Sequence, residues 1–289
     1  MTFALPTDTA TRPVAVLGAG TLGRRIALMF ATRGGQVRVY DPAVQAGQDA
    51  RAYVEQKVAE VAAGIEGGTP GTVTATTDLA EALAGAWLVV ESVPERLELK
   101  KRVFADLDRT ADPDAILASN SSSYPTSEFI DHVTRPERVL NMHFYMPPQQ
   151  PAVDLMSSGH TDRAVLDLLL RELPQYGVLP FEARRESTGF IFNRIWAAIK
   201  REALSVVAEG VSTPEDIDAM WASTMGTRGP FRTMDQVGLD VVLDIENHYA
   251  AKNPNLPAGP RELLRRYIDA GHLGVKTGRG FYDDYHQAD

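Results

Sequence analysis

The chain of 289 residues contains no cysteine, so disulfide bonds, thiolate catalysis and cysteine-ligated metal sites are excluded. It has no tract of basic residues, and its formal charge of −9 argues against nucleic acid or a membrane surface as the main partner. No apolar run approaches the length of a membrane-spanning helix, and the N-terminal residues are polar rather than signal-like. The six histidines show no metal-ligand pairing. We therefore expect a soluble cytoplasmic protein with no metal, nucleic acid or membrane partner.

The most informative stretch is residues 13–27, where a short apolar strand ends in glycines that open onto a helix. The first glycine would allow a sharp turn, the second would let the backbone approach a pyrophosphate, and the third would let the helix lie close to the strand. Free N–H groups at the start of the helix would then hold the phosphates. The expected cofactor-binding residues of this turn are Gly18, Gly20, Thr21, Leu22 and Gly23.

A second expected strand ends in Asp41, about 20 residues past the glycines, where an acid accepts the hydroxyls of an adenosine ribose. A carboxylate there would repel a 2′-phosphate, so the pattern favours NAD over NADP. The alternative is a plain acid at a strand end beside Pro42.

Strands and helices alternate from Pro13 to about Ala183, which is typical of a Rossmann-type, doubly wound parallel sheet with helices on both faces. Past Ser187 the pattern becomes helical, beginning with one long helix over residues 190–209 that is apolar on more than one side. We expect an NAD-binding domain over 1–186 and a helical domain over 187–289, and we expect the long helix to form a homodimer.

Several separated stretches of the chain resemble the 3-hydroxyacyl-CoA dehydrogenase family, in the order in which that family has them. They are the glycine turn with Asp41, residues 90–95 with Lys100, residues 119–123, His143-Phe144, and residues 189–194, 237–240 and 276–282. The resemblance implies a Rossmann domain, a helical dimerisation domain and NAD-dependent interconversion of 3-hydroxy and 3-oxo groups.

The resemblance also implies roles for individual residues. The residues along the nicotinamide half of the cofactor would be Glu95, Lys100 and Asn120. The residues that act on the substrate would be Ser122, Asn193 and His143. His143 would be the acid/base, because a histidine titrates near neutral pH and can both take and return a proton. Ser122 and Asn193 would donate hydrogen bonds to the reacting oxygen.

Each of these residues also has a purely structural interpretation. His143 could be a buried core histidine, Ser122 a turn or helix cap, and Asn193 a capping or interface amide. Lys100, beside other cationic residues, could belong to a solvated helix face.

The sequence departs from the family pattern at three places. The family has a Glu about twelve residues after the histidine, where this chain has Leu155 with Asp154 one residue earlier. A one-residue deletion would put Asp154 in that partner role; otherwise it is only a strand-end acid. Where the family usually has Asn, three residues past the histidine, this chain has Met146.

The third departure is a short region after the second strand, where the family's CoA enzymes carry a Lys-rich helical arm. Only Arg51 and Lys57 are cationic there, which suits the phosphates of CoA poorly. We therefore predict an NAD-dependent dehydrogenase or ketoreductase acting on a non-CoA 3-oxo or 3-hydroxy compound, such as a polyketide or sugar acid. The alternatives are a (3S)-3-hydroxyacyl-CoA dehydrogenase of β-oxidation and a non-catalytic NAD-binding sensor or structural dimer.

Overall fold

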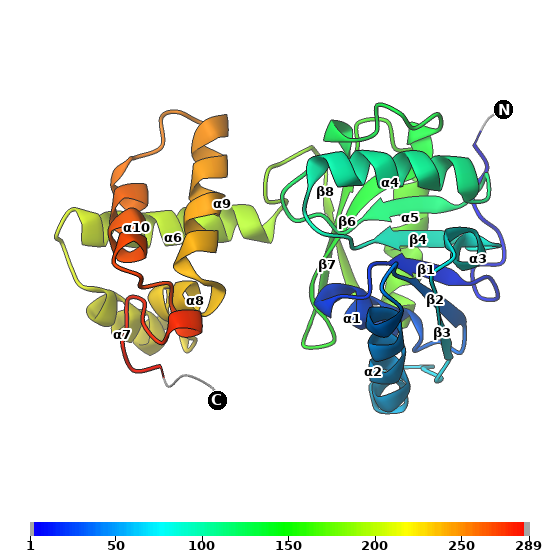
Figure 1. Ribbon diagram of the computed structural model, residues 1–289, viewed down its shortest axis with the longest axis horizontal. Helices are drawn as coiled ribbons and strands as arrows, with labels where there is room; N and C mark the ends of the chain where they lie inside the picture. The colour runs from blue at the N-terminus through cyan, green and yellow to red at the C-terminus, as the bar shows by residue number, and fades with distance from the viewer. Residues whose placement is uncertain (1–2, 286–289) are drawn as a thin grey trace. The chain divides into compact units, whose positions relative to one another are not determined.

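An eight-stranded sheet organises the first part of the computed structural model, which describes residues 3–285 (Figure 1). The strands are β1 Val14–Leu17, β2 Gln36–Tyr40, β3 Thr72–Thr76, β4 Leu88–Glu91, β5 Ile116–Ser119, β6 Val139–Met146, β7 Gln150–Ser157 and β8 Leu179–Ala183. Their order in the sheet is β3-β2-β1-β4-β5-β6-β7-β8. The expected Rossmann-type sheet is confirmed.

The direction of the last two strands differs from the expected all-parallel pattern. Strands β1 to β6 pair in parallel, but β7 runs antiparallel to β6, and β8 is parallel to β7. Only residues 147–149 separate β6 from β7, and a parallel crossover requires a dozen or more residues. A hairpin is therefore the connection that this short segment permits.

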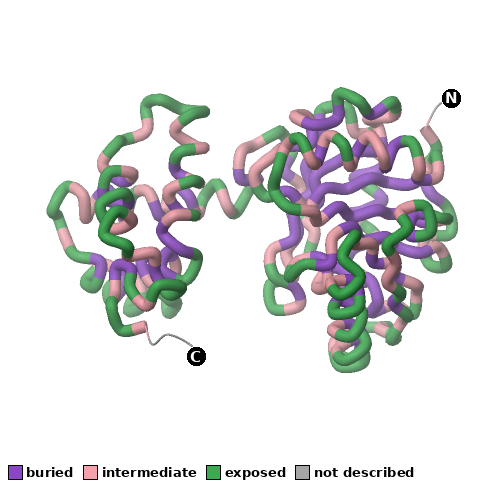
Figure 2. Tube along the Cα trace, in the orientation of Figure 1, coloured by how far each residue is buried: buried purple, intermediate pink, exposed green. Residues whose placement is uncertain are grey.

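Helices cover both faces of the sheet, and side chains alternate between two hydrophobic cores. These helices are α1 Thr21–Phe30, α2 Val44–Ala63, α3 Leu79–Leu83, α4 Leu97–Thr110 and α5 Arg163–Glu172. In β1, Val14 and Val16 pack with α1, α2 and α5, whereas Ala15 and Leu17 pack with α3 and α4. This two-sided burial follows from the alternation of side chains along a strand. Figure 2 shows the buried strands between the more exposed helices.

The chain divides into two compact units, Met1–Phe190 and Ile191–Asp289. The predicted domain boundary, after residue 186, lies a few residues before the boundary between these two units. The helices of the second unit are α6 Phe192–Ala208, α7 Pro214–Met225, α8 Pro230–Val237, α9 Leu239–Lys252 and α10 Gly259–Asp269. Its own core includes Leu204, Phe231 and Leu264, all fully buried. The helical character of this unit is thus confirmed, although the short α8 was not expected.

Short 3-10 turns complete the described structure, over Thr126–Glu128, Pro136–Arg138, Leu173–Tyr176 and Val275–Thr277. No helix within residues 3–285 is both long and apolar enough to cross a membrane.

Candidate active site

The glycine turn between β1 and α1 has the geometry of a phosphate-binding turn. Gly18 adopts a φ of +95°, and a Cβ atom there would lie 2.5 Å from the Ser92 carbonyl oxygen. A Cβ at Gly23 would lie 1.8 Å from the Gly18 oxygen, whereas one at Gly20 would have no atom within 4 Å. Gly18 and Gly23 are therefore required by the fold itself. The space at Gly20 fits a ligand that approaches the backbone, as NAD would.

The two other predicted residues of the turn differ in their surroundings. Thr21 is the exposed first residue of α1, while Leu22 packs its side chain against the core. Gly20, the N-cap residue, offers no side-chain hydrogen bond to the first turn. The backbone N–H groups of that turn can therefore donate hydrogen bonds to an anion.

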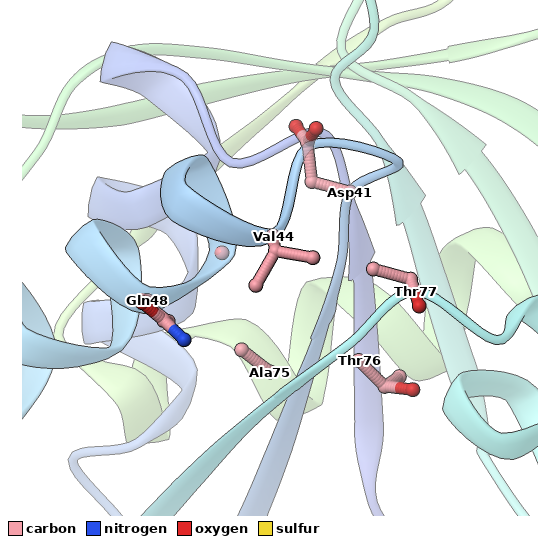
Figure 3. Close-up of a pocket in the computed structure, with 7 residues that line it drawn as sticks. Asp41, Val44, Gln48, Ala75, Thr76 and Thr77 are labelled. Atoms are coloured by element: carbon pink, nitrogen blue, oxygen red, sulfur yellow. The ribbon is translucent and has the colours of Figure 1, made fainter.

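Asp41 lies at the end of β2 and is held by the backbone of two neighbouring segments. Its Oδ2 accepts a hydrogen bond from the Ala19 amide at 2.8 Å, and its Oδ1 accepts one from the Ala43 amide at 2.9 Å. It lines a hollow of about 280 Å³ beside the ends of β2 and β3 and the start of α2 (Figure 3). The other lining residues are Val44, Gly47, Gln48, Ala75, Thr76 and Thr77. This hollow can accept a flat group attached to a ribose at Asp41.

A charge network whose members Glu91 and Lys100 are buried connects the end of β4 to α4. Lys100 Nζ lies 2.8 Å from Glu91 Oε1 and 3.2 Å from Glu95 Oε2. Ser119 and Ser121 donate hydrogen bonds to Glu91 and Glu95, respectively. The solvated-face alternative for Lys100 is wrong, because its side chain is 1% exposed. Glu91 was not among the expected site residues, although it is the last residue of a buried strand.

Asn120 ties the end of β5 to the strand that carries His143. Its Oδ1 accepts a hydrogen bond from the Phe144 amide at 2.8 Å. Ser122 follows two residues later and is exposed. The structure therefore brings the predicted residues of the 119–123 stretch to the same end of the sheet as His143.

Asp154, rather than Leu155, lies opposite His143. In the antiparallel β6–β7 pair, His143 registers with Asp154 and Met142 registers with Leu155. His143 Nδ1 is 3.6 Å from Asp154 Oδ2, and both residues are buried. Leu155 belongs to the hydrophobic core on the other face of the strand. The pairing puts a carboxylate within reach of the imidazole.

Two aromatic residues that were not among the expected site residues contact the imidazole. The Phe190 ring stacks on it, with centroids 4.9 Å apart and planes 6° apart, and the Tyr145 ring meets it edge-on at 4.8 Å. Phe190 has a φ of +53°, in the left-handed region, and its carbonyl oxygen accepts a hydrogen bond from Ser187 Oγ. Tyr145 lies two residues from His143, a spacing that puts both side chains on one face of the strand.

Met146 and Asn193 lie at the end of β6 and at the start of α6. Met146, at the end of β6, is 37% exposed. Asn193 lies in the first turn of α6, in the second unit. Within the described residues, no group of three or more His, Asp or Glu side chains could hold a metal ion.

A group of cations surrounds the Tyr53 ring of α2. Arg24 and Arg25 of α1 have their guanidinium carbons 4.8 and 6.0 Å from its centroid, and Lys57 Nζ is 5.5 Å away. Arg51, in contrast, is paired with Glu55 at 2.7 Å. Arg24 and Arg25 belong to α1 and were not expected at this surface, which therefore carries more positive charge than α2 alone supplies.

Comparison with known proteins identifies related sequences. The model of the 3-hydroxyacyl-CoA dehydrogenase NAD binding domain matches residues 13–186, and that of the C-terminal domain matches residues 189–284. A 3-hydroxybutyryl-CoA dehydrogenase of Mycobacterium tuberculosis is 37% identical over 287 residues, covering 94% of this chain and 98% of that protein.

Two further relatives have names that mention no CoA. A 5-formyl-3-hydroxy-2-methylpyridine 4-carboxylate 5-dehydrogenase of Mesorhizobium japonicum is 30% identical over 279 residues, covering 94% of this chain and 90% of that protein. The solved structure of a diketoreductase aligns with a TM-score of 0.78 at 29% identity, covering 98% of this chain and 99% of that one.

Proposed function

This chain belongs to the 3-hydroxyacyl-CoA dehydrogenase family, and we propose that it interconverts a 3-hydroxy and a 3-oxo group on a substrate without CoA, using His143 as the acid/base. It is an NAD-dependent oxidoreductase acting on CH–OH groups. The observation that supports the catalytic assignment is the register that brings Asp154 opposite His143.

Bound NAD would supply the hydride acceptor, and the chain supplies the groups that would hold it. We propose that the first turn of α1 binds the pyrophosphate and that Asp41 binds the adenosine ribose, with the adenine in the neighbouring hollow. Glu95, Lys100 and Asn120 are assigned to the nicotinamide half. Lys100 would act there chiefly by holding Glu95, because its own ammonium group is buried.

His143 takes the hydroxyl proton as the substrate is oxidised and returns it in the reverse direction. The carboxylate of Asp154 stabilises the imidazolium that forms. Ser122, exposed at the same end of the sheet, donates a hydrogen bond to the reacting oxygen, where negative charge develops. The family resemblance assigns the same role to Asn193, and an Asn193→Ala variant tests that assignment separately.

Two observations bear on the substrate. The short segment after β2 and the relatives whose names mention no CoA support a CoA-free compound. The cations of Arg24, Arg25 and Lys57 favour the second candidate, an acyl-CoA, because they could bind phosphate groups.

The test is the loss of NADH absorbance with acetoacetyl-CoA and, in parallel, with CoA-free 3-oxo acids, diketones and aromatic polyketide analogues. Turnover of the CoA-free compounds alone supports the proposal, whereas efficient turnover of the thioester overturns it in favour of the acyl-CoA enzyme. The His143→Asn variant should bind NADH normally and lose hydride transfer. If the wild-type protein binds NADH and turns over none of these classes, the non-catalytic alternative is favoured.

We also propose that the chain forms a homodimer through its second unit. Phe192 and Ile195 of α6 are 56% and 55% exposed, and Met220 of α7 is 73% exposed. Such large exposed apolar side chains are typical of a subunit interface. Sedimentation velocity at micromolar concentration should show a dimer, and a monomer would contradict this proposal.

A further inference from the structure

Asp154 has a second partner, which competes with His143 for the same oxygen atom. The Tyr145 hydroxyl donates a hydrogen bond to Asp154 Oδ2 at 2.6 Å. The distance from that oxygen to His143 Nδ1 is 3.6 Å, which is too long for a hydrogen bond. Within the described residues, Nδ1 is buried and has no hydrogen-bond partner.

A hydroxyl that donates to a carboxylate changes what that carboxylate can do for a third group. The O–H···O⁻ bond is charge-assisted, so it stabilises the anion and occupies one of its lone pairs. Asp154 is therefore directed toward the tyrosine, and less of its charge is available to an imidazolium on His143.

We propose that Tyr145 is a positioning residue that holds Asp154 off His143 and thereby sets the pH at which His143 changes its charge. The consequence for turnover rests on the proposed function, in which His143 is the acid/base. The effect on the charge of His143 rests only on the contacts among these three side chains.

Two aromatic rings contact the imidazole besides Asp154. Asp154 faces it from β7 and Tyr145 from its own strand, while the Phe190 ring on its flat side is apolar. From β5, Asn120 binds the Phe144 amide. From α1, Arg25 donates to the Pro147 carbonyl in the β6–β7 hairpin.

The Tyr145→Phe variant removes the hydroxyl and keeps the ring. Asp154 Oδ2 can then close on Nδ1, so the imidazolium gains a full carboxylate partner. We expect the midpoint of the His143 titration to rise by about one pH unit. Alcohol oxidation requires neutral His143, so the acid limb of the pH profile of turnover should move to higher pH by the same amount. Asp154→Asn should move the His143 midpoint and this acid limb to lower pH.

The experiment is an NMR titration of the histidine ring protons in the full-length, cofactor-free protein, with the His143 signal assigned by its loss in His143→Asn. Tyr176→Phe is the matched control, because it removes a hydroxyl from another buried ring of the same unit. Its His143 midpoint should equal that of the wild type. The pH profile of turnover is measured on the same variants.

A Tyr145→Phe midpoint that stays unchanged or falls would overturn the inference. So would an Asp154→Asn midpoint that moves upward, which remains a decisive result if Tyr145→Phe does not fold. The proposed function fails separately, if His143→Asn keeps its turnover while the NMR midpoints move as expected. If His143→Asn is inactive and the Tyr145→Phe midpoint is unchanged, only the role of Tyr145 is lost.

Discussion

Lys100 of α4 and Glu91 of β4 form an ion pair inside the first unit, with their side chains 1% and 0% exposed. Glu91 also accepts hydrogen bonds from Ser119 Oγ and the Val93 amide, so each of its oxygens is satisfied. Two charges removed from water in this way are tolerated only while both are present. The pair therefore fixes the end of β4 to helix α4.

Replacing Lys100 by Met should destabilise the protein by about 3 kcal/mol, because Glu91 would remain buried without its counter-ion. The measurement is the free energy of unfolding in urea. Lys101→Met is the matched control, since Lys101 pairs with the exposed Glu98 and should contribute less than about 1 kcal/mol. Equal losses in the two variants would contradict the importance of the buried pair.

Replacing a glycine of the turn by alanine should have a different effect at Gly20 than at Gly23. Gly20→Ala should fold normally, since its methyl group meets no atom, yet bind NADH roughly tenfold more weakly. Gly23→Ala should lose about 1–3 kcal/mol of stability, because its methyl group would collide with the Gly18 carbonyl. Thermal unfolding and NADH fluorescence titration separate the two effects. A Gly20→Ala variant with unchanged NADH affinity would argue against backbone contact with the pyrophosphate.

The charge of Asp41 should determine the choice of cofactor. Asp41→Asn removes the carboxylate that would repel a 2′-phosphate, so the ratio of kcat/KM for NADPH to that for NADH should rise by roughly tenfold. Asp49→Asn is a suitable control, because Asp49 is an exposed acid on α2 that binds Gln45. If the ratio is the same in both variants, Asp41 does not discriminate between the cofactors.

Protonation of Asp114 at low pH should lower the free energy of unfolding. A hydrogen bond from Arg12 holds the pKa of Asp114 below its ordinary value of 3.8, although partial burial opposes the shift. A carboxyl whose pKa is lower in the folded state stabilises the protein above its ordinary pKa, and this contribution is lost as the pH falls through the folded value.

Asp114→Asn should therefore cost up to about 1 kcal/mol at neutral pH, and progressively less as the pH falls below the ordinary pKa of 3.8. The measurement is urea unfolding at neutral pH and at a series of acidic pH values. Asp112→Asn provides the comparison, because Asp112 lies farther from the same guanidinium, at 3.6 Å. A loss for Asp114→Asn that is as large in acid as at neutral pH would exclude this linkage.

The sequence alone determined the order of the elements and the identity of the cofactor. Strands and helices alternate in the first unit as the sequence predicts, and the second unit is helical as expected. The glycine turn and Asp41 were recognisable because their requirements are local: a positive φ, a close backbone approach and an acid at a strand end. Such requirements are met by residues close together in the chain, so they can be recognised in the sequence.

Only the tertiary structure decided which distant side chains meet. The spacing left open whether Asp154 is the partner of His143 or only a strand-end acid, and the β6–β7 register placed Asp154 opposite His143. The stacking of Phe190 on His143 and the burial of Lys100 against Glu91 likewise depend on segments far apart in the chain. Side-chain alternation tells which residues share a face of one strand. The alignment of that strand with its neighbour is set by the packing of the whole sheet, so the contacts of His143 could not be read from its local sequence.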